Sequence, residues 1–156
     1  MTDSHSEIRR FVVDASVAAK WFLRDEPGSQ SAEMLLADFR ENRIQLLAPV
    51  HLHVEVSSAI RNAVRTGRLS VDDAREAIEV FMAWQIETVG GPEPILAGFD
   101  RAVRFGGSLY DGIYLALAEA VASPLVHADA RLRNALGDRF PLAIWLADYV
   151  PAGSSG

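Results

Sequence analysis

The stretch Phe11-Val-Val-Asp14 decides the fold. Three consecutive apolar residues predict a short strand that is buried on both faces, as in a sheet covered by helices on either side. An aspartate follows this strand directly, and the same order returns at Leu125-Val-His-Ala-Asp129. Ligands of open parallel sheets bind beyond the carboxyl ends of the strands. The two aspartates therefore indicate the edge of the sheet at which we expect the functional site.

Short apolar runs alternate with amphipathic segments along the rest of the chain. Besides the strands at 11–13 and 125–128, strands are expected at 44–48, 86–89 and 142–146. Helices are expected at 16–23, 31–41, 49–66, 70–82, 94–105, 108–122 and 131–136, the third of them opening at Pro49. This alternation predicts an α/β fold, a three-layer sandwich in which a parallel five-stranded sheet is flanked by helices.

The length and composition narrow the class of protein. With 156 residues, the chain is expected to form one domain over 10–150, with a mobile tail at 1–9 and a flexible tail at 151–156. It has no cysteine, which excludes disulfides, zinc–cysteine sites and thiol nucleophiles. Lys20 is the only lysine, which argues against P-loop and Schiff-base chemistry. There is no long apolar run and no secretory signal, so we expect a cytoplasmic protein without membrane contact.

Two further carboxylates are placed to join Asp14 and Asp129 at the sheet edge. Asp111 lies in the first turn of the helix that begins at Ser108, and Glu55 lies one and a half turns into the helix after the second strand. On a helical wheel Glu55 borders the apolar face, where an unpaired carboxylate is costly. Each aspartate also has an alternative role as a helix cap, Asp111 through a capping box with Ser108.

Four converging carboxylates would repel each other unless a cation neutralised them. Mg²⁺ and Mn²⁺ prefer oxygen ligands, and in proteins they often share them with water and phosphate. Such an ion lowers the pKa of a bound water and offsets charge on a scissile phosphate, so no nucleophilic side chain is needed. The four carboxylates therefore predict a divalent-metal site suited to phosphodiester hydrolysis.

Four segments resemble, in order, the motifs of the PIN-domain ribonucleases, in particular the VapC-type toxins of bacterial toxin–antitoxin pairs. The similar segments span about residues 10–147 and are Phe11–Leu23, Ala48-Pro49 with Glu55, Ser108–Glu119 and Leu125–Leu132. The resemblance implies a Mg²⁺- or Mn²⁺-dependent endoribonuclease that acts on RNA. It also implies a cognate antitoxin that blocks the site, and a homodimer. By position, the catalytic and metal-binding set would be Asp14, Glu55, Asp111 and Asp129.

Three neighbouring residues are candidate auxiliaries. Ser16 would bond Asp14 or a metal-bound water, or else cap a helix. His127 stands where the family usually has Thr or Ser, and would orient a phosphate or pack at the sheet edge. Arg131 lies within the fourth motif, near Asp129 and the expected cleft. Gly112 stands where the family commonly has Ala, and this difference is expected to matter little.

Two other classes of function differ in how well they fit the sequence. Other phosphotransfer classes fit poorly, because a haloacid-dehalogenase-like phosphatase needs a second Asp where Ser16 stands and a receiver domain needs a late Lys. A non-catalytic PIN-like module that binds RNA or protein stays open. The net charge of −6 at first argues against nucleic acid. Outside the four site carboxylates, however, 17 acidic residues face 15 basic ones, so RNA is not excluded and its affinity should depend on divalent metal.

Overall fold

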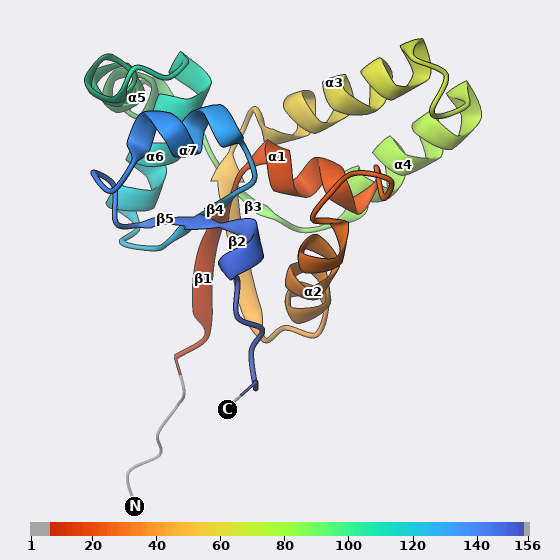
Figure 1. The fold of residues 1–156 in the computed structure, drawn as a ribbon, viewed down its shortest axis with the longest axis horizontal. Coiled ribbons are helices and arrows are strands. Elements are labelled where there is room, and N and C mark those ends of the chain that lie inside the picture. The colour runs from red at the N-terminus through yellow and green to blue at the C-terminus, as the bar shows by residue number, and fades with distance from the viewer. Residues whose placement is uncertain (1–6, 155–156) are drawn as a thin grey trace, which may run out of the picture.

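The computed structural model describes residues 7–154 and places a five-stranded sheet at the centre of the molecule (Figure 1). Its strands are β1 (Arg9–Val13), β2 (Ile44–Pro49), β3 (Glu87–Val89), β4 (Leu125–His127) and β5 (Ala143–Trp145). They lie in the order β3-β2-β1-β4-β5, and all neighbours are parallel. The run that begins at Phe11 thus forms the central strand, as its continuous apolar character predicts.

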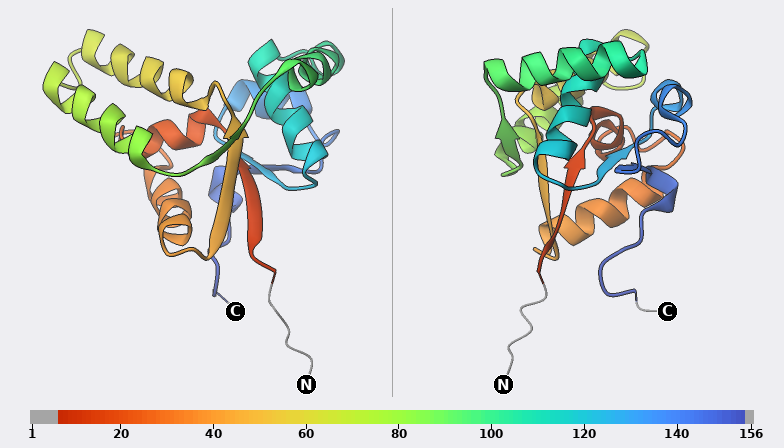
Figure 2. Two further views of the ribbon diagram at one scale, coloured as in Figure 1. Left: turned by 180° about the vertical axis from the view of Figure 1, so that it is seen from behind. Right: turned by 90° about the vertical axis from the view of Figure 1, so that its left-hand side faces the viewer.

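Helices cover both faces of the sheet, which confirms the predicted three-layer α/β sandwich (Figures 1 and 2). One side carries α1 (Ala15–Ala18), the short 3₁₀ helix η1 (Ala19–Trp21), α2 (Ser29–Arg40), α3 (Leu52–Arg65) and α4 (Val71–Ala83). The other side carries α5 (Pro92–Phe105), α6 (Leu109–Ala120) and α7 (Ala130–Leu136). A second 3₁₀ helix, η2 (Leu146–Asp148), follows the last strand.

Successive side chains of β1 enter two different cores, because residues along a strand point alternately to opposite faces. Phe11 and Val13 pack in the core under α1 to α4, with Trp21 among its members. Val12 packs in the second core, under α5 to α7, where Tyr114 is fully buried. The central strand therefore joins the two helical layers and fixes the position of the residue that follows it, Asp14.

Helices α5 and α6 cross in close contact through two glycines. A Cβ placed on Gly112 would lie 2.0 Å from the Gly98 carbonyl oxygen, and one on Gly98 would lie 2.4 Å from the Ile113 side chain. The first of these neighbours is backbone, which cannot rotate away. The expectation that Gly112 matters little is therefore wrong for this chain, because a larger residue would force α6 away from α5.

The structure shifts several predicted boundaries. Pro49 is the last residue of β2, paired with Val89, and does not open a helix. The helix starts at Leu52, so Glu55 lies in its first turn rather than one and a half turns in. The expected helix at 16–23 is α1 followed by η1. These segments are short, and local sequence signals place their ends less sharply than those of long periodic helices.

The described part of the chain begins and ends near the amino end of the central strand, opposite the carboxyl ends of the strands (Figure 2). Strand β1 already includes Arg9. Buried Asp38 accepts hydrogen bonds from the Tyr149 hydroxyl at 2.5 Å, the Ala152 backbone N–H at 2.7 Å and the Arg43 Nε at 2.8 Å. The start of the predicted C-terminal tail is thus tied to α2, while residues 1–6 and 155–156 of the predicted tails lie outside the described residues. Between residues 7 and 154, no helix has the length and apolar character needed to cross a membrane.

Candidate active site

Asp14 follows β1 and caps α1. Its Oδ2 accepts hydrogen bonds from the Ser16 backbone N–H at 3.0 Å and from the Ser16 hydroxyl. The Ser16 hydroxyl oxygen in turn accepts from the Ala128 N–H at 2.9 Å, so it links the ends of β1 and β4. The side chain of Asp14 caps the helix, so the alternative that Ser16 is the cap is wrong, whereas its predicted bond to Asp14 is confirmed. Asp14 is only 7% exposed.

Glu55 enters the same edge from the first turn of α3. Its Oε1 accepts a hydrogen bond of 3.0 Å from the hydroxyl of Tyr114, a fully buried residue of α6. His51 Nε2 lies 3.2 Å from the same oxygen, but out of line for a hydrogen bond. Burial lowers the pKa of His51, which disfavours an ion pair between His51 and Glu55. Glu55 is thus held by a residue from the opposite helical layer.

Asp111 lies in the first turn of α6 and Asp129 is the N-cap of α7, as their positions in the sequence predict. Ser108 and Asp111 form a capping box, in which Asp111 Oδ2 accepts from the Ser108 N–H at 3.1 Å and Ser108 Oγ accepts from the Asp111 N–H at 3.1 Å. Asp129 Oδ1 accepts from the Arg131 N–H at 2.9 Å and the Leu132 N–H at 3.3 Å. Capping fixes both carboxylates near helix N-termini, where the helix dipole favours negative charge.

The pKa values of Asp14 and Glu55 respond to burial and to neighbouring carboxylates. Burial, opposed by the Ser16 hydrogen bonds and reinforced by the charges of Asp111 and Asp129, raises the pKa of Asp14 to about 6. Burial also raises the pKa of Glu55 to about 7, with further increases from Asp14 and Asp111. The Tyr114 hydrogen bond lowers the Glu55 pKa but does not cancel these effects. The fold therefore brings the four predicted carboxylates within electrostatic range at one edge of the sheet.

Each of the four carboxylates divides its two oxygens in the same way. Among residues 7–154, one oxygen of each accepts the bonds given above, and the other has no hydrogen-bond partner. The free oxygens are Oδ1 of Asp14, Oε2 of Glu55, Oδ1 of Asp111 and Oδ2 of Asp129. Within the same described range, no three acidic or histidine side chains lie close enough, as they stand, to enclose an ion. The free carboxylate oxygens are of the type that a hard cation prefers.

Of the candidate auxiliary residues, His127 is buried at the sheet edge and Arg131 is exposed on α7. His127 ends β4 with 2% exposure, its ring edge-on to Trp145 at 5.6 Å between centroids, and burial lowers its pKa. It packs at the sheet edge, as one of its two predicted roles requires. Arg131 is exposed on α7 and does not line the cleft beside Asp129.

The cleft itself is a hollow of about 410 Å³ between α1, α3 and the end of β4. Its lining includes Ser16, Glu55 and Asp129, together with Lys20 and its partner Glu26. Lys20 was not predicted as a site residue. Its signal in the sequence was that it is the only lysine of the chain and lies within the first motif. Tyr114 was also missed, and its signal was the spacing of three residues from Asp111, which puts both on one side of α6.

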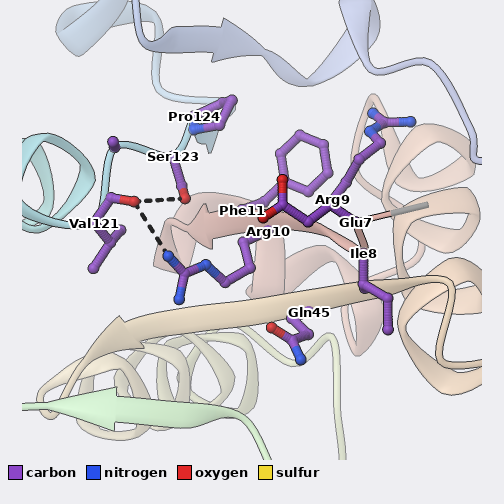
Figure 3. A pocket seen from close by; sticks show the side chains of 10 residues that line it. Glu7, Ile8, Arg9, Arg10, Phe11, Gln45, Val121, Ser123 and Pro124 are labelled. Carbon is purple, nitrogen blue, oxygen red and sulfur yellow. Dashed lines mark hydrogen bonds between the residues drawn. The ribbon is translucent and has the colours of Figure 1, made fainter. Parts of the chain in front are cut away.

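A separate hollow of about 720 Å³ lies at the opposite end of the sheet (Figure 3). It lies between the amino ends of β1 and β4, where Arg10 and the Ser123 hydroxyl both donate to the Val121 carbonyl. None of the four carboxylates lines it. Ligands of parallel α/β sheets bind at the carboxyl ends of strands, which is where the cleft lined by Glu55 and Asp129 lies and this hollow does not.

Comparison with known proteins agrees with this assignment. The family model described as PIN domain matches residues 11–136, which include all four carboxylates. The chain belongs to the PIN domain family. Within it, the chain is of the VapC type: it is 30% identical over 135 residues to the VapC ribonuclease Mb0985 of Mycobacterium bovis. That alignment covers 85% of this chain and 96% of the relative.

Solved structures share the PIN-domain fold. PAE2754 from Pyrobaculum aerophilum superposes with a TM-score of 0.66 at 23% identity, covering 90% of this chain and 92% of that one. VapC20 of Mycobacterium tuberculosis, titled a sarcin-ricin loop cleaving toxin, superposes with a TM-score of 0.60 at 17% identity, covering 80% and 94%. At these identities the likeness supports the fold alone.

Proposed function

We propose that this PIN-domain protein is a divalent-metal-dependent endoribonuclease and the toxin of a toxin–antitoxin pair. The observation that carries the proposal is the set of four carboxylates at one sheet edge, each with one fixed oxygen and one free oxygen. Membership of the VapC-type ribonucleases supports the substrate class, RNA, and the cytoplasm as the place of action.

The residues that would hold Mg²⁺ or Mn²⁺ are Asp14, Glu55, Asp111 and Asp129. A divalent ion at this site supplies a water of lowered pKa and offsets the charge of the scissile phosphate. Burial raises the pKa values of Asp14 and Glu55, and the charges of the neighbouring carboxylates raise them further, so a bound cation would offset an unfavourable concentration of negative charge.

The chain's own residues hold the carboxylates rather than react with RNA. Ser16 fixes the Asp14 carboxylate and the end of β4 with a single hydroxyl. Tyr114 fixes Glu55 from the opposite layer of the sandwich. The capping bonds fix Asp111 and Asp129. Pre-organisation of this kind reduces the movement needed to bind metal and phosphate together.

Cleavage of RNA by the purified protein tests this proposal. We expect cleavage with Mg²⁺ or Mn²⁺, loss of cleavage in EDTA, and a reduction of at least about 100-fold in Asp14→Asn. The matched control is Asp138→Asn, which changes an exposed aspartate that does not line the cleft, and it should cleave normally. EDTA-resistant cleavage that persists in Asp14→Asn would contradict the mechanism. Failure of the native protein both to cleave RNA and to bind Mn²⁺ would favour the non-catalytic binding module instead.

An antitoxin needs a surface to bind, and the layer of α1 to α4 offers one. A groove of about 420 Å³ lies between η1, α2 and α4, with Phe22 stacked on Trp84 at 5.3 Å. Its rim carries charges of both signs, including Arg24, Arg40 and Glu76. An apolar floor with a charged rim suits an amphipathic helix of a partner protein. Co-expression with the product of an adjacent small reading frame should give a stable complex in which RNA cleavage is inhibited.

We also infer that a second copy of the chain covers the outer face of α5. This face exposes four apolar side chains at helical spacing, Ile95, Leu96, Phe99 and Val103. Contiguous exposed apolar surface of this kind is unusual on a monomer and typical of an interface. Leu109 and Tyr110, at the start of the adjoining α6, are also exposed, so the surface continues toward Asp111 and the site.

A further inference from the structure

A second hollow adjoins the carboxylate cleft at the ends of β4 and β5. It has a volume of about 420 Å³ and shares two lining residues with the cleft, Lys20 and Ala128. The rest of its wall is mainly apolar and includes Pro27, Trp145 and Leu146. The described lining contains no carboxylate, so this hollow suits a flat and largely apolar group rather than an ion.

Trp145 gives this hollow a fixed aromatic wall. The indole is only partly buried, the Arg133 guanidinium lies 4.6 Å from its centroid, and the ring of His127 meets it edge-on. These contacts hold the ring in one orientation while part of it still lines the hollow. Aromatic side chains held in this way are stacking surfaces for the bases of single-stranded nucleic acid, because every base has an apolar face.

Lys20 places a positive charge between the two hollows. Its side chain is 12% exposed, and its Nζ lies 3.4 Å from Glu26 Oε2, a long contact. Glu26 is also 3.4 Å from the Arg68 guanidinium, so this carboxylate is shared between two cations. The ammonium of Lys20 thus retains capacity to pair with a phosphate, for which its three donors are suited.

The order of strands sets these features in a row. From β2 to β5, the carboxyl edge carries Glu55 in the helix after β2, Asp14 directly after β1, Asp129 just beyond β4, and Trp145 as the last residue of β5. We propose that the hollow is a nucleobase subsite, in which the base beside the scissile phosphate stacks on Trp145 while Lys20 binds a phosphate of the same strand. This inference rests on the proposed function for the identity of its ligand, single-stranded RNA. Continuity with the cleft and the cation at their junction favour a nucleotide over a protein segment.

The subsite is tested without metal and without cleavage. Nucleoside monophosphates and ribose 5-phosphate are titrated separately into the native protein in EDTA, and the three tryptophan indole N–H signals are followed by NMR. The Trp145 signal is assigned with Trp145→Phe. We expect nucleoside monophosphates to shift the Trp145 signal selectively and ribose 5-phosphate to leave it unchanged. No shift at millimolar nucleotide, or an equal shift with ribose 5-phosphate, would overturn the proposal.

Variants separate the base contact from the phosphate contact. Ala147→Leu fills the hollow from an exposed position, and we expect nucleotide binding to weaken roughly tenfold, a typical effect of losing one stacked base. The matched control, Ala120→Leu, adds the same side chain at an exposed position outside the hollow and should bind normally. Lys20→Gln should weaken binding of the monophosphates but not of the corresponding nucleosides. Normal binding in both Ala147→Leu and Lys20→Gln would contradict the subsite.

The two proposals fail in different ways. If the native protein does not cleave RNA but nucleotides still shift Trp145, the nuclease assignment fails and the subsite stands. If RNA is cleaved with metal but nucleotides leave Trp145 unchanged, the nuclease assignment stands and the subsite fails. In cleavage assays the subsite predicts that Ala147→Leu raises KM several-fold while kcat changes little, because a base contact formed equally in substrate and transition state affects binding alone.

Discussion

At the residue scale, each of the three site aspartates combines two roles that the sequence presented as alternatives. Asp14, Asp111 and Asp129 cap helices with one oxygen and leave the other free toward the site. Capping orients the carboxylate, since the same backbone that opens the helix fixes the side chain. The structural role of these residues therefore supports the proposed catalytic one rather than competing with it.

Tyr114→Phe tests how Glu55 is positioned. The substitution keeps the buried ring but removes the hydroxyl that donates to Glu55 Oε1, so the pKa of Glu55 should rise further. We expect Mn²⁺ affinity in calorimetry to fall roughly tenfold, as for other residues that orient metal ligands. The control is Tyr110→Phe, because the Tyr110 hydroxyl has no hydrogen-bond partner among the described residues. Equal Mn²⁺ affinity in the native protein and Tyr114→Phe would show that this bond does not position Glu55.

The pH dependence of stability follows from the raised carboxyl pKa values. The folded metal-free protein holds the Asp14 proton more tightly than the unfolded chain, so this group stabilises the fold most below about pH 4 and less as pH rises through about 6. At about 1.4 kcal/mol per pKa unit, the loss is of the order of 3 kcal/mol by pH 8. Asp14→Asn lacks this titration, so its stability relative to the native protein should increase between pH 4 and pH 8 in urea unfolding.

Divalent metal should reverse this trend. Mn²⁺ competes with the protons on Asp14 and Glu55, so at pH 8 it should stabilise the native protein and leave Asp14→Asn much less affected. If, without metal, the stability difference between the native protein and Asp14→Asn does not change with pH, the pKa of about 6 for Asp14 is contradicted.

At the scale of elements, the position of Asp111 depends on how α5 packs against α6. The Gly98 and Gly112 pair brings these helices together and so sets where the first turn of α6 lies. The resemblance suggested that Gly112 and Ala are exchangeable at this position. Only the crossing of α5 and α6 shows that in this chain they are not, because a helix wheel contains no information about a neighbouring backbone.

Gly112→Ala should accordingly destabilise the fold. The added Cβ would lie 2.0 Å from the Gly98 carbonyl oxygen, and moving α6 to relieve this contact should cost about 1–3 kcal/mol. Denaturant unfolding measures the cost. Ala120→Ser, at the exposed end of the same helix, is the control and should change stability by less than about 0.5 kcal/mol. Unchanged stability of Gly112→Ala would show that α5 and α6 are packed less tightly than the structure indicates.

At the scale of the whole molecule, the two helical layers divide the proposed interactions. The layer of α1 to α4 carries the groove for a protein partner, and the layer of α5 to α7 carries the apolar face for a second copy. The site lies at the sheet edge between them. Both proposed contacts thus approach the cleft from different sides without occupying the same surface.

Phe99→Arg tests the proposed dimer. A charge in the centre of the α5 face should convert a particle of twice 17.0 kDa into a monomer in light scattering, because an unpaired buried charge is costly. Val71→Arg, at a similarly exposed valine on α4, is the control and should stay dimeric. A native protein that is monomeric at all concentrations would contradict the assignment of this face.

The sequence predicted the architecture, and it placed the four carboxylates after strands or near helix starts, where the structure has them, since both depend on local signals. Apolar runs identified the five strands, and carboxylates directly after strands or at helix starts must meet at one edge of a parallel sheet. What could not be predicted were contacts between distant segments. The bond from Tyr114 to Glu55 and the Trp145 wall beside Lys20 each join residues far apart in sequence.

The central claim is that Asp14, Glu55, Asp111 and Asp129 form one metal site. Crystals of the native protein soaked in Mn²⁺ test it directly, because anomalous scattering locates the ion without assumptions about the ligands. We expect an anomalous peak at coordination distance from Asp14 and from at least one other of the four carboxylates. Asp14→Asn crystals treated in the same way should show no such peak. A fully soaked native crystal with no peak at this edge, or with its peak elsewhere, would contradict the account.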